Sequence, residues 1–379
     1  MKVAFFQPYL ANWRITFLTK FIEKTNHEVI VYDGGFSSKK DEKSVTNNNA
    51  SFNVEKLYSF SPVFNFKGQK YPFYFSPFLF FKLIKDKPDV IITEGEINFV
   101  NNIFIFLYCF LFKRKYVWWS LGKVRTRKKN IINKILDPIV DFLLYKANCI
   151  MTRTSWAKKY YIEDKGILPN KIIVAPNSMD EDKARAEVNV SLVKELKEQY
   201  KGNIILYVGA LTEEKKPKDL IDAYNYLVKN KLLNKSTYLW FVGAGPEFES
   251  LKNYVSTLGL QDDIVFWGKV FDGVGSYFEA SDMVVVPGLG GLVINHAMIF
   301  GKPVVSRVAD GTELDLVENE ITGYLLEDND IQSLALAIKK TLLPENLILM
   351  SEAARNKVDS FWNIKTMISR VEECIQYKG

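Results

Sequence analysis

Residues 287–305 read Pro287-Gly-Leu-Gly-Gly-Leu-Val-Ile-Asn-His-Ala-Met-Ile-Phe-Gly-Lys-Pro-Val-Val305. This stretch predicts the end of a buried strand, a glycine-rich turn, a helix and, after Gly-Lys-Pro, a second buried strand. The turn glycines let a backbone approach a ligand closely; they are Gly288, Gly290 and Gly291. The N–H groups of Gly291, Leu292 and Val293 would begin the helix without intrahelical partners and so suit an anion. Taken alone, the glycines are also typical of a tight strand–helix turn without a ligand.

Short apolar runs alternate with helix-like stretches on either side of this segment. In the first half they are Lys2–Phe6, Glu28–Tyr32, Pro88–Thr93, Cys149–Thr152 and Lys171–Ala175. A second series comprises Gly202–Gly209, Thr237–Gly243, Asp263–Gly268, Met283–Pro287 and Lys302–Ser306. Such runs, separated by helices, are typical of parallel strands covered on both faces. The predicted fold class is therefore α/β, with two Rossmann-like, doubly wound domains facing across a cleft.

The domain boundaries follow from where the pattern restarts. We expect a first domain over residues 1–180, a second over 200–355, and a final helical segment, 356–379, that crosses back to the first. The polar stretch 177–202 is the expected linker. Ligands of doubly wound sheets bind at the carboxyl ends of the strands, so the loops after the strands are the candidate sites.

Composition excludes several other classes. The 379 residues are 47% hydrophobic and 25% charged with a net charge of +6, which is typical of a globular chain rather than a dedicated nucleic-acid binder. The three cysteines have neither disulfide nor zinc spacing, so we expect a reducing, cytoplasmic location. The amino terminus does not read as a signal peptide, and the longest apolar run, 103–112, is too short to span a bilayer.

Six motifs in order carry a family resemblance. They are Val208-Gly-Ala-Leu-Thr-Glu-Glu-Lys-Lys-Pro217, Gly243-Ala-Gly-Pro-Glu247, Phe266-Trp-Gly268, Ala280-Ser-Asp-Met-Val-Val-Val-Pro287 with the glycine turn, Asp310-Gly-Thr-Glu-Leu-Asp-Leu-Val317, and Ile321-Thr-Gly-Tyr-Leu-Leu326. Together the motifs resemble the donor domain of retaining glycosyltransferases of the GT-B fold, family four, also called glycosyl transferases group 1. The resemblance is strong over roughly 170–335 and extends to the whole chain by architecture. It implies a nucleotide-sugar donor and an acceptor domain in the first half.

In this family a basic loop after the first strand of the donor domain holds the diphosphate. Lys215, in the loop that starts at Gly209, matches the family's lysine, and it is the predicted catalytic cation. Ala210 stands where the family has an arginine; Lys216 or Arg307 is the expected replacement for that charge. Lysines in such a loop are otherwise ordinary solvated side chains.

The family also carries two glutamates eight positions apart around the glycine turn. The first implies a contact to the sugar hydroxyls and the second a contact to the ribose. Gly288 and His296 occupy these positions, so both carboxylates of the E-x7-E motif are replaced. We predict that the His296 imidazole faces the ribose; the alternative is a helix histidine satisfied within the protein.

Other positions match parts of the donor pocket. The resemblance implies that five residues shape the nucleobase pocket: Gly243, Gly245, Phe266, Trp267 and Gly268. Their alternative is turn geometry and core packing. Asp315 matches an acidic residue before the Thr-Gly turn, with a surface helix carboxylate as the alternative.

The first domain offers two charged candidates. Arg14 begins the first helix in an aromatic–Arg pattern and is predicted to meet a phosphate, and Glu94 is predicted on the acceptor side. Their alternatives are a surface arginine and a loop-capping acid. The chain has only two histidines, His27 and His296, which disfavours Ser-His-Asp or Cys-His hydrolysis. A retaining transferase depends less on a positioned base, because the departing phosphate can take the acceptor proton.

The segment Lys113–Lys134 carries nine Lys or Arg residues and no Asp or Glu. Tyr116, Trp118 and Trp119 interleave them, and residues 71–81 are dense in aromatics. Basic and aromatic side chains together suit a peripheral protein on an anionic leaflet. A solvated charge run and an ordinary aromatic core are the alternatives; nucleic acid is not expected.

The sequence therefore predicts a glycosyltransferase that uses a UDP-, GDP- or dTDP-sugar as substrate and a glycan or lipid-linked saccharide as acceptor, in cell-surface polysaccharide synthesis. No metal site and no cofactor are expected, since Asp328-Asn-Asp330 reads as a helix start. The alternatives are a sugar-nucleotide epimerase or hydrolase on the same fold, or a non-catalytic binding partner in a glycan-assembly complex.

Overall fold

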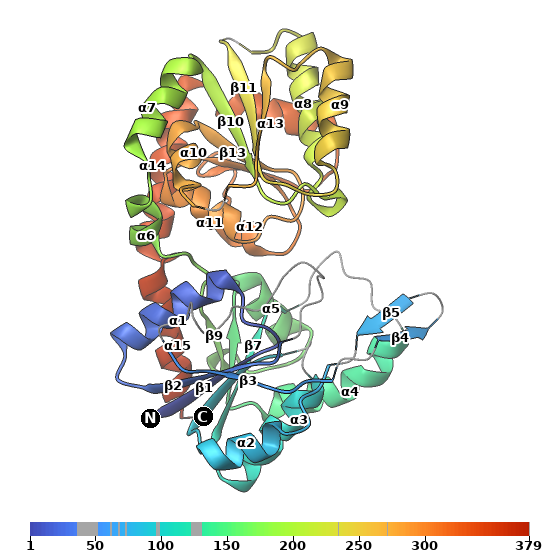
Figure 1. The fold of residues 1–379 in the computed structure, drawn as a ribbon, viewed down its shortest axis with the longest axis vertical. Helices are drawn as coiled ribbons and strands as arrows, with labels where there is room; N and C mark the ends of the chain where they lie inside the picture. Colours follow the sequence, from blue (N-terminus) through green and yellow to red (C-terminus); the bar gives the residue numbers. More distant parts are fainter. Residues whose placement is uncertain are drawn as a thin grey trace. The chain divides into compact units, whose positions relative to one another are not determined.

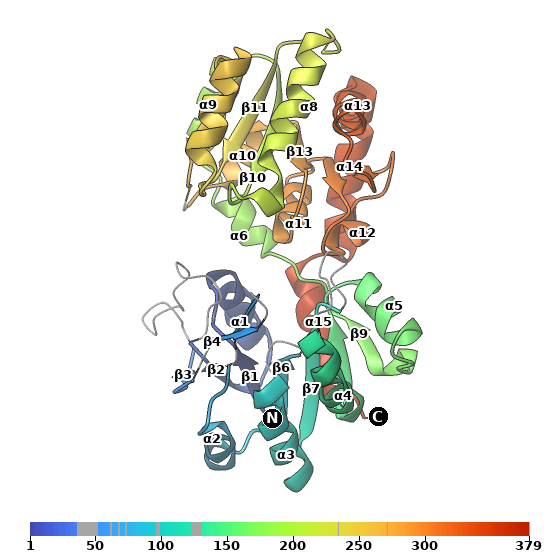
Figure 2. The same cartoon turned by 90° about the vertical axis from the view of Figure 1, so that its right-hand side faces the viewer.

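The computed structural model describes residues 1–35, 52–60, 63–66, 69–72, 74–95, 99–122, 131–233, 235–270 and 272–378. The chain forms two compact units, which are drawn in Figures 1 and 2. Unit 1 comprises Met1–Lys123, Arg127–Pro176 and Lys365–Gly379, and unit 2 comprises Val124–Thr126 and Asn177–Ile364.

Unit 1 is built on a parallel sheet with strand order β3-β2-β1-β6-β7-β8-β9. Its strands are β1 (Lys2–Gln7), β2 (Glu28–Asp33), β3 (Val54–Lys56), β6 (Val90–Glu94), β7 (Lys115–Ser120), β8 (Cys149–Thr152) and β9 (Ile172–Val174). The inner strands are apolar along their length because helices cover both faces, and Val3–Phe6 are fully buried. A separate antiparallel pair joins β4 (Val63–Phe66) and β5 (Gln69–Pro72).

Six helices belong to unit 1. They are α1 (Asn12–Lys24), α2 (Leu79–Asp86), α3 (Phe99–Leu111), α4 (Ile131–Lys146), α5 (Ser155–Glu163) and α15 (Ile364–Gln376), with a short turn at η3 (Pro169–Lys171). Helices α2, α3 and α4 cover one face of the sheet through Leu83, Ile105 and Leu143. Helix α1 contributes Phe17 and Phe21, which pack edge-on against Phe5 of β1.

Helix α15 is the last element and joins unit 1, although the chain reaches it from unit 2 (Figures 1 and 2). The Lys115 ammonium donates to the Ile375 carbonyl at 2.7 Å, and the His27 imidazole lies 2.9 Å from the Glu372 carboxylate. The crossing begins at Lys365, later than the expected residue 356, because helix α14 (Pro344–Ser360) still packs in unit 2.

Unit 2 holds a second parallel sheet with strand order β12-β11-β10-β13-β14-β15. Its strands are β10 (Asn203–Val208), β11 (Thr237–Val242), β12 (Ile264–Gly268), β13 (Met283–Val286), β14 (Val304–Arg307) and β15 (Gly323–Leu326). The predicted strand runs of the second half match the first five of these closely. Apolar clusters fill both faces of the sheet.

The helices of unit 2 pack on both faces of its sheet. They are α6 (Glu181–Ala186), α7 (Val190–Gln199), α8 (Pro217–Lys229), α9 (Phe248–Leu258), α10 (Gly275–Ala280), α11 (Leu292–Ile299), α12 (Thr312–Leu316), α13 (Ile331–Thr341) and α14, with η4 at Glu213–Lys215. Asn189 caps α7, and Asp330 caps α13 by accepting from the Ser333 N–H. The expectation that Asp328–Asp330 starts a helix is confirmed.

Within the part of the chain that the structure describes, none of the helices combines the length and the apolar character that crossing a bilayer demands.

Candidate functional site

The strand order of unit 2 places two loops beside each other. The chain runs outward from β10 through β11 to β12, then returns to β13 on the other side of β10 and continues to β15. The topological switch point therefore lies between β10 and β13, where the loop after Val208 and the glycine turn after Val286 meet. Doubly wound sheets bind their ligands at such a point.

Lys215 connects these two loops. Its ammonium donates to the Leu289 carbonyl of the glycine turn at 2.8 Å. The aliphatic stem of Lys215 passes beside Gly209, where an added Cβ would lie 3.6 Å from the Lys215 Cδ and Nζ atoms. The basic loop therefore places its lysine at the switch point, and the diphosphate contact that the family resemblance implies stays a prediction.

Gly288 is a close-packing position in this arrangement. A Cβ at Gly288 would lie 2.5 Å from the Glu214 carbonyl oxygen and 2.8 Å from the Lys215 carbonyl carbon. The Leu289 N–H also donates to the Glu214 carbonyl at 3.3 Å. The turn and the lysine loop thus touch through their backbones, so position 288 has no room for the side chain that the family uses toward the sugar.

The amino end of α11 supplies unused backbone donors at the same place. Gly291 precedes the helix with φ of 65°, a left-handed value that favours glycine, and its terminus has no side-chain cap. The first N–H groups, including those of Leu292 and Val293, therefore have no side-chain acceptor and suit an anion. Gly290 packs on Val286, since its Cβ would lie 2.7 Å from Val286 Cγ1.

His296 lies on the buried side of α11. Its ring centroid is 4.3 Å from that of Phe278 and 5.6 Å from that of Phe300, and 7% of the residue is exposed. Burial lowers the pKa of the imidazole to about 4, so it is neutral at pH 7. These contacts favour aromatic packing over the predicted ribose contact, which stays a prediction.

The residues predicted for the nucleobase pocket serve packing in unit 2. The Gly209 N–H donates to the Val242 carbonyl, and the Gly243 N–H donates to the Gly268 carbonyl. These bonds connect the carboxyl ends of the neighbouring strands β10, β11 and β12. A Cβ at Gly243 would lie 1.8 Å from the Gly209 carbonyl oxygen, and one at Gly245 would lie 2.2 Å from that of Leu211. The glycines therefore allow close backbone approach.

The two aromatic members of that set pack into opposite faces of the sheet. Phe266 stacks on Phe241 with centroids 4.9 Å apart. Trp267 contacts Trp240 and Tyr277 edge-on, at 5.5 and 5.3 Å. The core-packing alternative thus accounts for both rings.

The two residues expected to replace the missing arginine both bind acceptors within unit 2, and their role toward a diphosphate stays a prediction. Arg307, at the end of β14, is buried and pairs with Asp219; it also donates to the Asn329 carbonyl at 3.0 Å. Lys216 has φ of 51° and its ammonium donates to the Asn329 side chain at 2.6 Å. Both cations contact the loop before α13, and Arg307 also donates to the Pro287 carbonyl, at the start of the glycine turn, at 3.4 Å.

Sequence reasoning missed Glu313 and chose its neighbour Asp315. Glu313 is 1% exposed and accepts from the N–H groups of Ala309 and Gly311, at 2.7 and 3.0 Å. Burial raises the pKa of this carboxyl group, and the backbone donors oppose that rise. Glu313 therefore orders the loop after β14, whereas Asp315 is half-buried on α12. The signal was available, since Gly-x-Glu fits a carboxylate that closes a turn on its own backbone.

In unit 1, the two predicted charges pair with each other. Arg14 is 1% exposed; its guanidinium donates to Glu94 at 3.0 Å and lies 3.9 Å from the Trp119 ring centroid. Arg153, which the sequence did not single out, donates to the same Glu94 oxygen at 2.9 Å. Burial, followed by the charge of Arg153, lowers the pKa of Arg14 to about 9. Two guanidinium groups thus share one carboxylate at the carboxyl edge of the sheet.

The predicted basic and aromatic surface is revised. Tyr116, Trp118 and Trp119 are at most 1% exposed, so reading them as surface aromatics is wrong: they alternate into both faces of the unit 1 sheet. Of the basic residues, Arg114 pairs with Asp89, Lys115 binds the Ile375 carbonyl, and Lys113 is exposed. Residues 123–130 and the side chain of Lys134 lie outside the described part.

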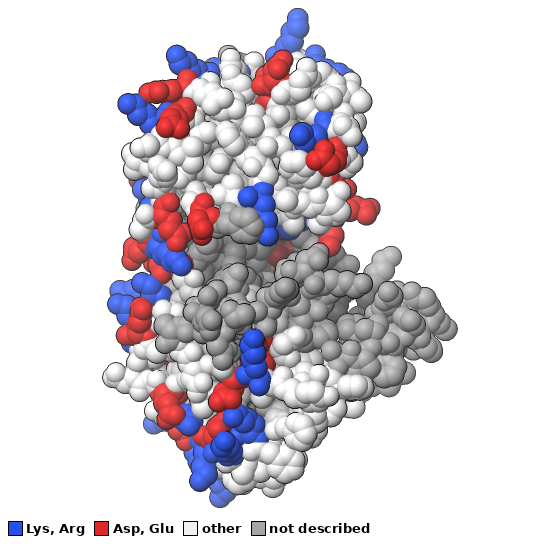
Figure 3. All heavy atoms as spheres, viewed as in Figure 1, with Lys and Arg blue, Asp and Glu red and all other residues white. Residues whose placement is uncertain are grey.

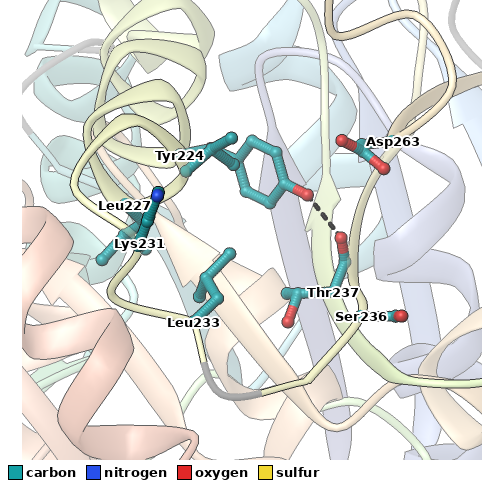
Figure 4. A pocket seen from close by; sticks show the side chains of 8 residues that line it. Tyr224, Leu227, Lys231, Leu233, Ser236, Thr237 and Asp263 are labelled. Carbon is teal, nitrogen blue, oxygen red and sulfur yellow. Dashed lines mark hydrogen bonds between the residues drawn. The ribbon is translucent and has the colours of Figure 1, made fainter.

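A small cavity of about 290 Å³ lies at the other edge of the unit 2 sheet (Figure 4). Tyr224 of α8 points across it to the Thr237 carbonyl, where β11 begins, and Asp263 lies beyond. Since the loops of Lys215 and Gly288 follow the carboxyl ends of the strands, this cavity belongs to a different edge from the candidate site. Among the described residues, no group of three or more His, Cys, Asp or Glu side chains is arranged to hold a metal ion.

Comparisons with known proteins agree with this geometry. Residues 191–357 match the family model described as "Glycosyl transferases group 1". A UDP-Gal:alpha-D-GlcNAc-diphosphoundecaprenol alpha-1,3-galactosyltransferase of Escherichia coli is 30% identical over 222 residues, which are 57% of each chain. An N-acetyl-alpha-D-glucosaminyl L-malate synthase of Bacillus anthracis is 27% identical, over 54% of each chain. The chain thus spans little more than half the length of these curated relatives.

Solved structures extend the likeness to the whole fold. HepE of Anabaena, solved in complex with UDP, superposes with a TM-score of 0.75 at 18% identity, over 98% of this chain and 99% of that one. WaaG, a glycosyltransferase involved in lipopolysaccharide biosynthesis, gives 0.64 at 14%, over 99% and 100%. The predicted fold class, two Rossmann-like domains of the GT-B type, is confirmed. Residues 191–357 therefore carry a domain of the glycosyl transferases group 1 family.

Proposed function

We propose that the protein moves a sugar from a nucleotide-sugar donor to a glycan or lipid-linked saccharide acceptor in cell-surface polysaccharide synthesis, with retention at the anomeric carbon. The observation that carries this proposal is the meeting of the Lys215 ammonium and the uncapped amino end of α11 at the switch point of unit 2. Negative charge grows on a diphosphate as its sugar departs, and fixed donors there lower the barrier.

UDP is the first nucleotide to test, because the E. coli relative is named for UDP-Gal and HepE was solved with UDP. GDP and dTDP sugars remain candidates. The nucleotide sugar is the substrate in this proposal, which includes neither a resident cofactor nor a metal.

The chemistry needs few side chains. The bond between the anomeric carbon and the diphosphate oxygen breaks, and the acceptor hydroxyl oxygen forms the new bond on the same face. The departing phosphate oxygen takes the hydroxyl proton, so no histidine base is required. Lys215 and the N–H groups at 291–293 would hold that phosphate.

On the acceptor side, we propose that Arg14 and Arg153 receive a phosphate of a lipid-linked acceptor. They share Glu94, and both guanidinium groups lie at the carboxyl edge of the sheet, where such domains bind their ligands. A lipid-linked acceptor would place the protein at the inner face of the cell membrane.

Thermal unfolding with UDP, GDP and dTDP sugars tests donor binding. One nucleotide sugar should raise the Tm of the wild type by several degrees, because binding to the folded state alone stabilises it. Lys215→Ala should lose most of this shift, whereas Lys218→Ala, an exposed neighbour paired with Asp222, should keep it. If no nucleotide sugar shifts the Tm, the proposal fails.

A non-catalytic binding partner is the second candidate, since Gly288 offers no carboxylate and His296 packs among aromatic rings. That candidate predicts binding without turnover. Incubation of the donor with and without an acceptor separates the candidates. A transferase consumes the donor only when the acceptor is present. Without an acceptor, an epimerase changes the sugar of the donor and a hydrolase releases it, whereas a binding partner leaves the donor unchanged.

A further inference from the structure

Helix α3 of unit 1 is apolar on both faces. Its 13 residues, Phe99–Leu111, contain no charged side chain. Ile105 and Tyr108 are buried against the sheet, while Leu107, Phe110 and Leu111 are 40%, 69% and 56% exposed. A helix that is apolar all round is normally covered on both sides, so its outer surface needs an explanation.

The neighbouring helices extend this surface. Phe78 and Phe81, at the start of α2, are 62% and 68% exposed, and Phe142 of α4 is 49% exposed. Phe106 bridges α3 and α4, because its ring lies 5.6 Å from that of Phe142 and 5.9 Å from that of Phe110. The three helices lie together at one side of unit 1 in Figures 1 and 2. We call the surface formed by Phe78, Phe81, Leu107, Phe110, Leu111 and Phe142 the outer apolar face.

The charges beside the outer apolar face are mainly positive. Four lysines near the helix ends are exposed: Lys85, Lys87, Lys113 and Lys146. Three nearby carboxylates are held in ion pairs, namely Asp86 with Lys82, Asp89 with Arg114, and Asp141 with Lys165. In the space-filling view, an uncharged area over α2 and α3 lies next to Lys and Arg side chains (Figure 3).

We infer that the outer apolar face binds the surface of a lipid bilayer that contains anionic lipids. Aromatic and aliphatic side chains enter the boundary between headgroups and acyl chains, and the lysines contact the negative headgroups. A second copy fits this face less well, because a symmetric contact would bring lysines of the same sign together. This inference deepens the proposed membrane location. It rests on the proposed function in one respect: the lipid-linked acceptor is the reason for the protein to bind a membrane.

The face differs from the segment that the sequence favoured. The aromatics of Lys113–Lys134 are in the core, whereas the exposed ones lie on α2, α3 and α4. Of that basic segment, the described exposed cation is Lys113, which follows α3 directly. The membrane contact is therefore assigned to helix faces.

Co-sedimentation with vesicles tests this assignment. The wild type should bind vesicles of phosphatidylcholine mixed with phosphatidylglycerol, and bind phosphatidylcholine alone more weakly. Phe81→Ser with Phe110→Ser should weaken binding to both at least tenfold. The matched control is Ile348→Ser with Leu349→Ser, two side chains of α14 in unit 2 that are 69% and 66% exposed, and it should bind as the wild type does.

A second pair separates charge from apolar contact. Lys85→Gln with Lys113→Gln should weaken binding to the anionic vesicles by roughly 30-fold, since each near-surface cation contributes about 1 kcal/mol. High salt should remove this difference. Lys201→Gln with Lys235→Gln, exposed positions of unit 2, should change nothing.

The inference is overturned if the wild type sediments with neither kind of vesicle. If, in addition, sedimentation velocity shows a wild-type dimer that Phe81→Ser with Phe110→Ser abolishes, the face belongs to a second copy. Lys215→Ala should bind vesicles as the wild type does. Vesicle binding and sugar transfer can therefore fail independently of each other. Circular dichroism checks that every variant is folded.

Discussion

The carboxyl edges of the two sheets differ in the groups that form them: ionised side chains in unit 1 and closely packed glycine backbones in unit 2. In unit 1, Arg14, Glu94 and Arg153 gather around Trp119, so the edge is defined by ionised side chains. In unit 2, Gly209, Gly243, Gly268 and Gly288 bring backbones into contact, and Lys215 adds one cation.

The difference matters because a backbone edge and a side-chain edge respond differently to substitution. The glycines of unit 2 leave no room for a side chain between neighbouring backbones, so the donors that this edge offers a ligand are mainly backbone N–H groups such as those at the start of α11. The charged edge of unit 1 depends on the balance between two guanidinium groups and one carboxylate. Four substitutions test this contrast.

Lys215→Ala tests the cation that joins the basic loop to the glycine turn at the unit 2 edge. We expect kcat to fall by about 10² to 10³, or roughly 3 to 4 kcal/mol, because one preorganised donor to the leaving group is lost. The Tm should change little, since the Lys215 ammonium bonds to the carbonyl of a loop residue, Leu289. Lys218→Ala is the control; steady-state kinetics and thermal unfolding are the measurements. An unchanged kcat would mean that the backbone donors act alone.

Gly243→Ala tests the backbone contact itself. A Cβ there would lie 1.8 Å from the Gly209 carbonyl oxygen, so the strand ends must separate. We expect unfolding in urea to require about 3 kcal/mol less, at the upper end of overpacking costs. Gly259→Ala, with φ of 70° and open space around it, should cost only about 1 kcal/mol. Equal losses would show that positive φ, and not contact, decides the cost.

These glycines show what sequence could and could not predict. The alternation of apolar runs predicted five strands in each half, and the loop of Lys215 was a candidate because ligands of doubly wound sheets bind at the carboxyl ends of strands. The strand order, and with it the switch point beside Lys215, comes from the structure. Strand β7 was not among the predicted runs. The sequence could not distinguish a glycine that approaches a ligand from one that approaches a neighbouring loop. Gly288 is of the second kind, and only the 2.5 Å approach to Glu214 reveals it.

Charged residues show a second limit. Arg14 and Glu94 are 80 positions apart and were predicted separately, but the sheet joins them and adds Arg153. Trp118 and Trp119 follow a run of cations in sequence, yet they belong to a central strand and are buried. Residues that are close in sequence do not indicate which residues are close across a sheet. The ion pairs of Glu94 could therefore be identified only from the structure.

Glu94→Gln tests the charge balance in unit 1. Removing the shared carboxylate leaves Arg14 and Arg153 facing each other, and we expect a loss of about 2 kcal/mol, below the full cost of a broken buried pair because Glu94 is partly exposed. Glu28→Gln removes an exposed partner of Lys2 and should cost less than 1 kcal/mol. If phosphate ions restore the stability of Glu94→Gln, the arginines form an anion site. If Glu94→Gln is as stable as the control, the unit 1 edge does not depend on its ion pairs.

At neutral pH the smallest expected effect is that of His296, the buried imidazole on α11. The pKa of His296 is about 4 in the folded protein against 6.5 for the free side chain, because burial disfavours the cation. Between these values the unfolded state binds the extra proton, so stability is full above pH 6.5 and falls as the pH drops toward 4, by at most about 1.4 kcal/mol per pH unit. His296→Leu keeps the aromatic neighbours packed and removes this proton; urea unfolding at several pH values should then show a shallower slope than the wild type over the same window. If the imidazole instead faces the ribose, His296→Leu should weaken nucleotide binding at pH 7.5 and leave the dependence of stability on pH unchanged. His296 would then contact the ligand at the unit 2 edge, together with the backbone donors.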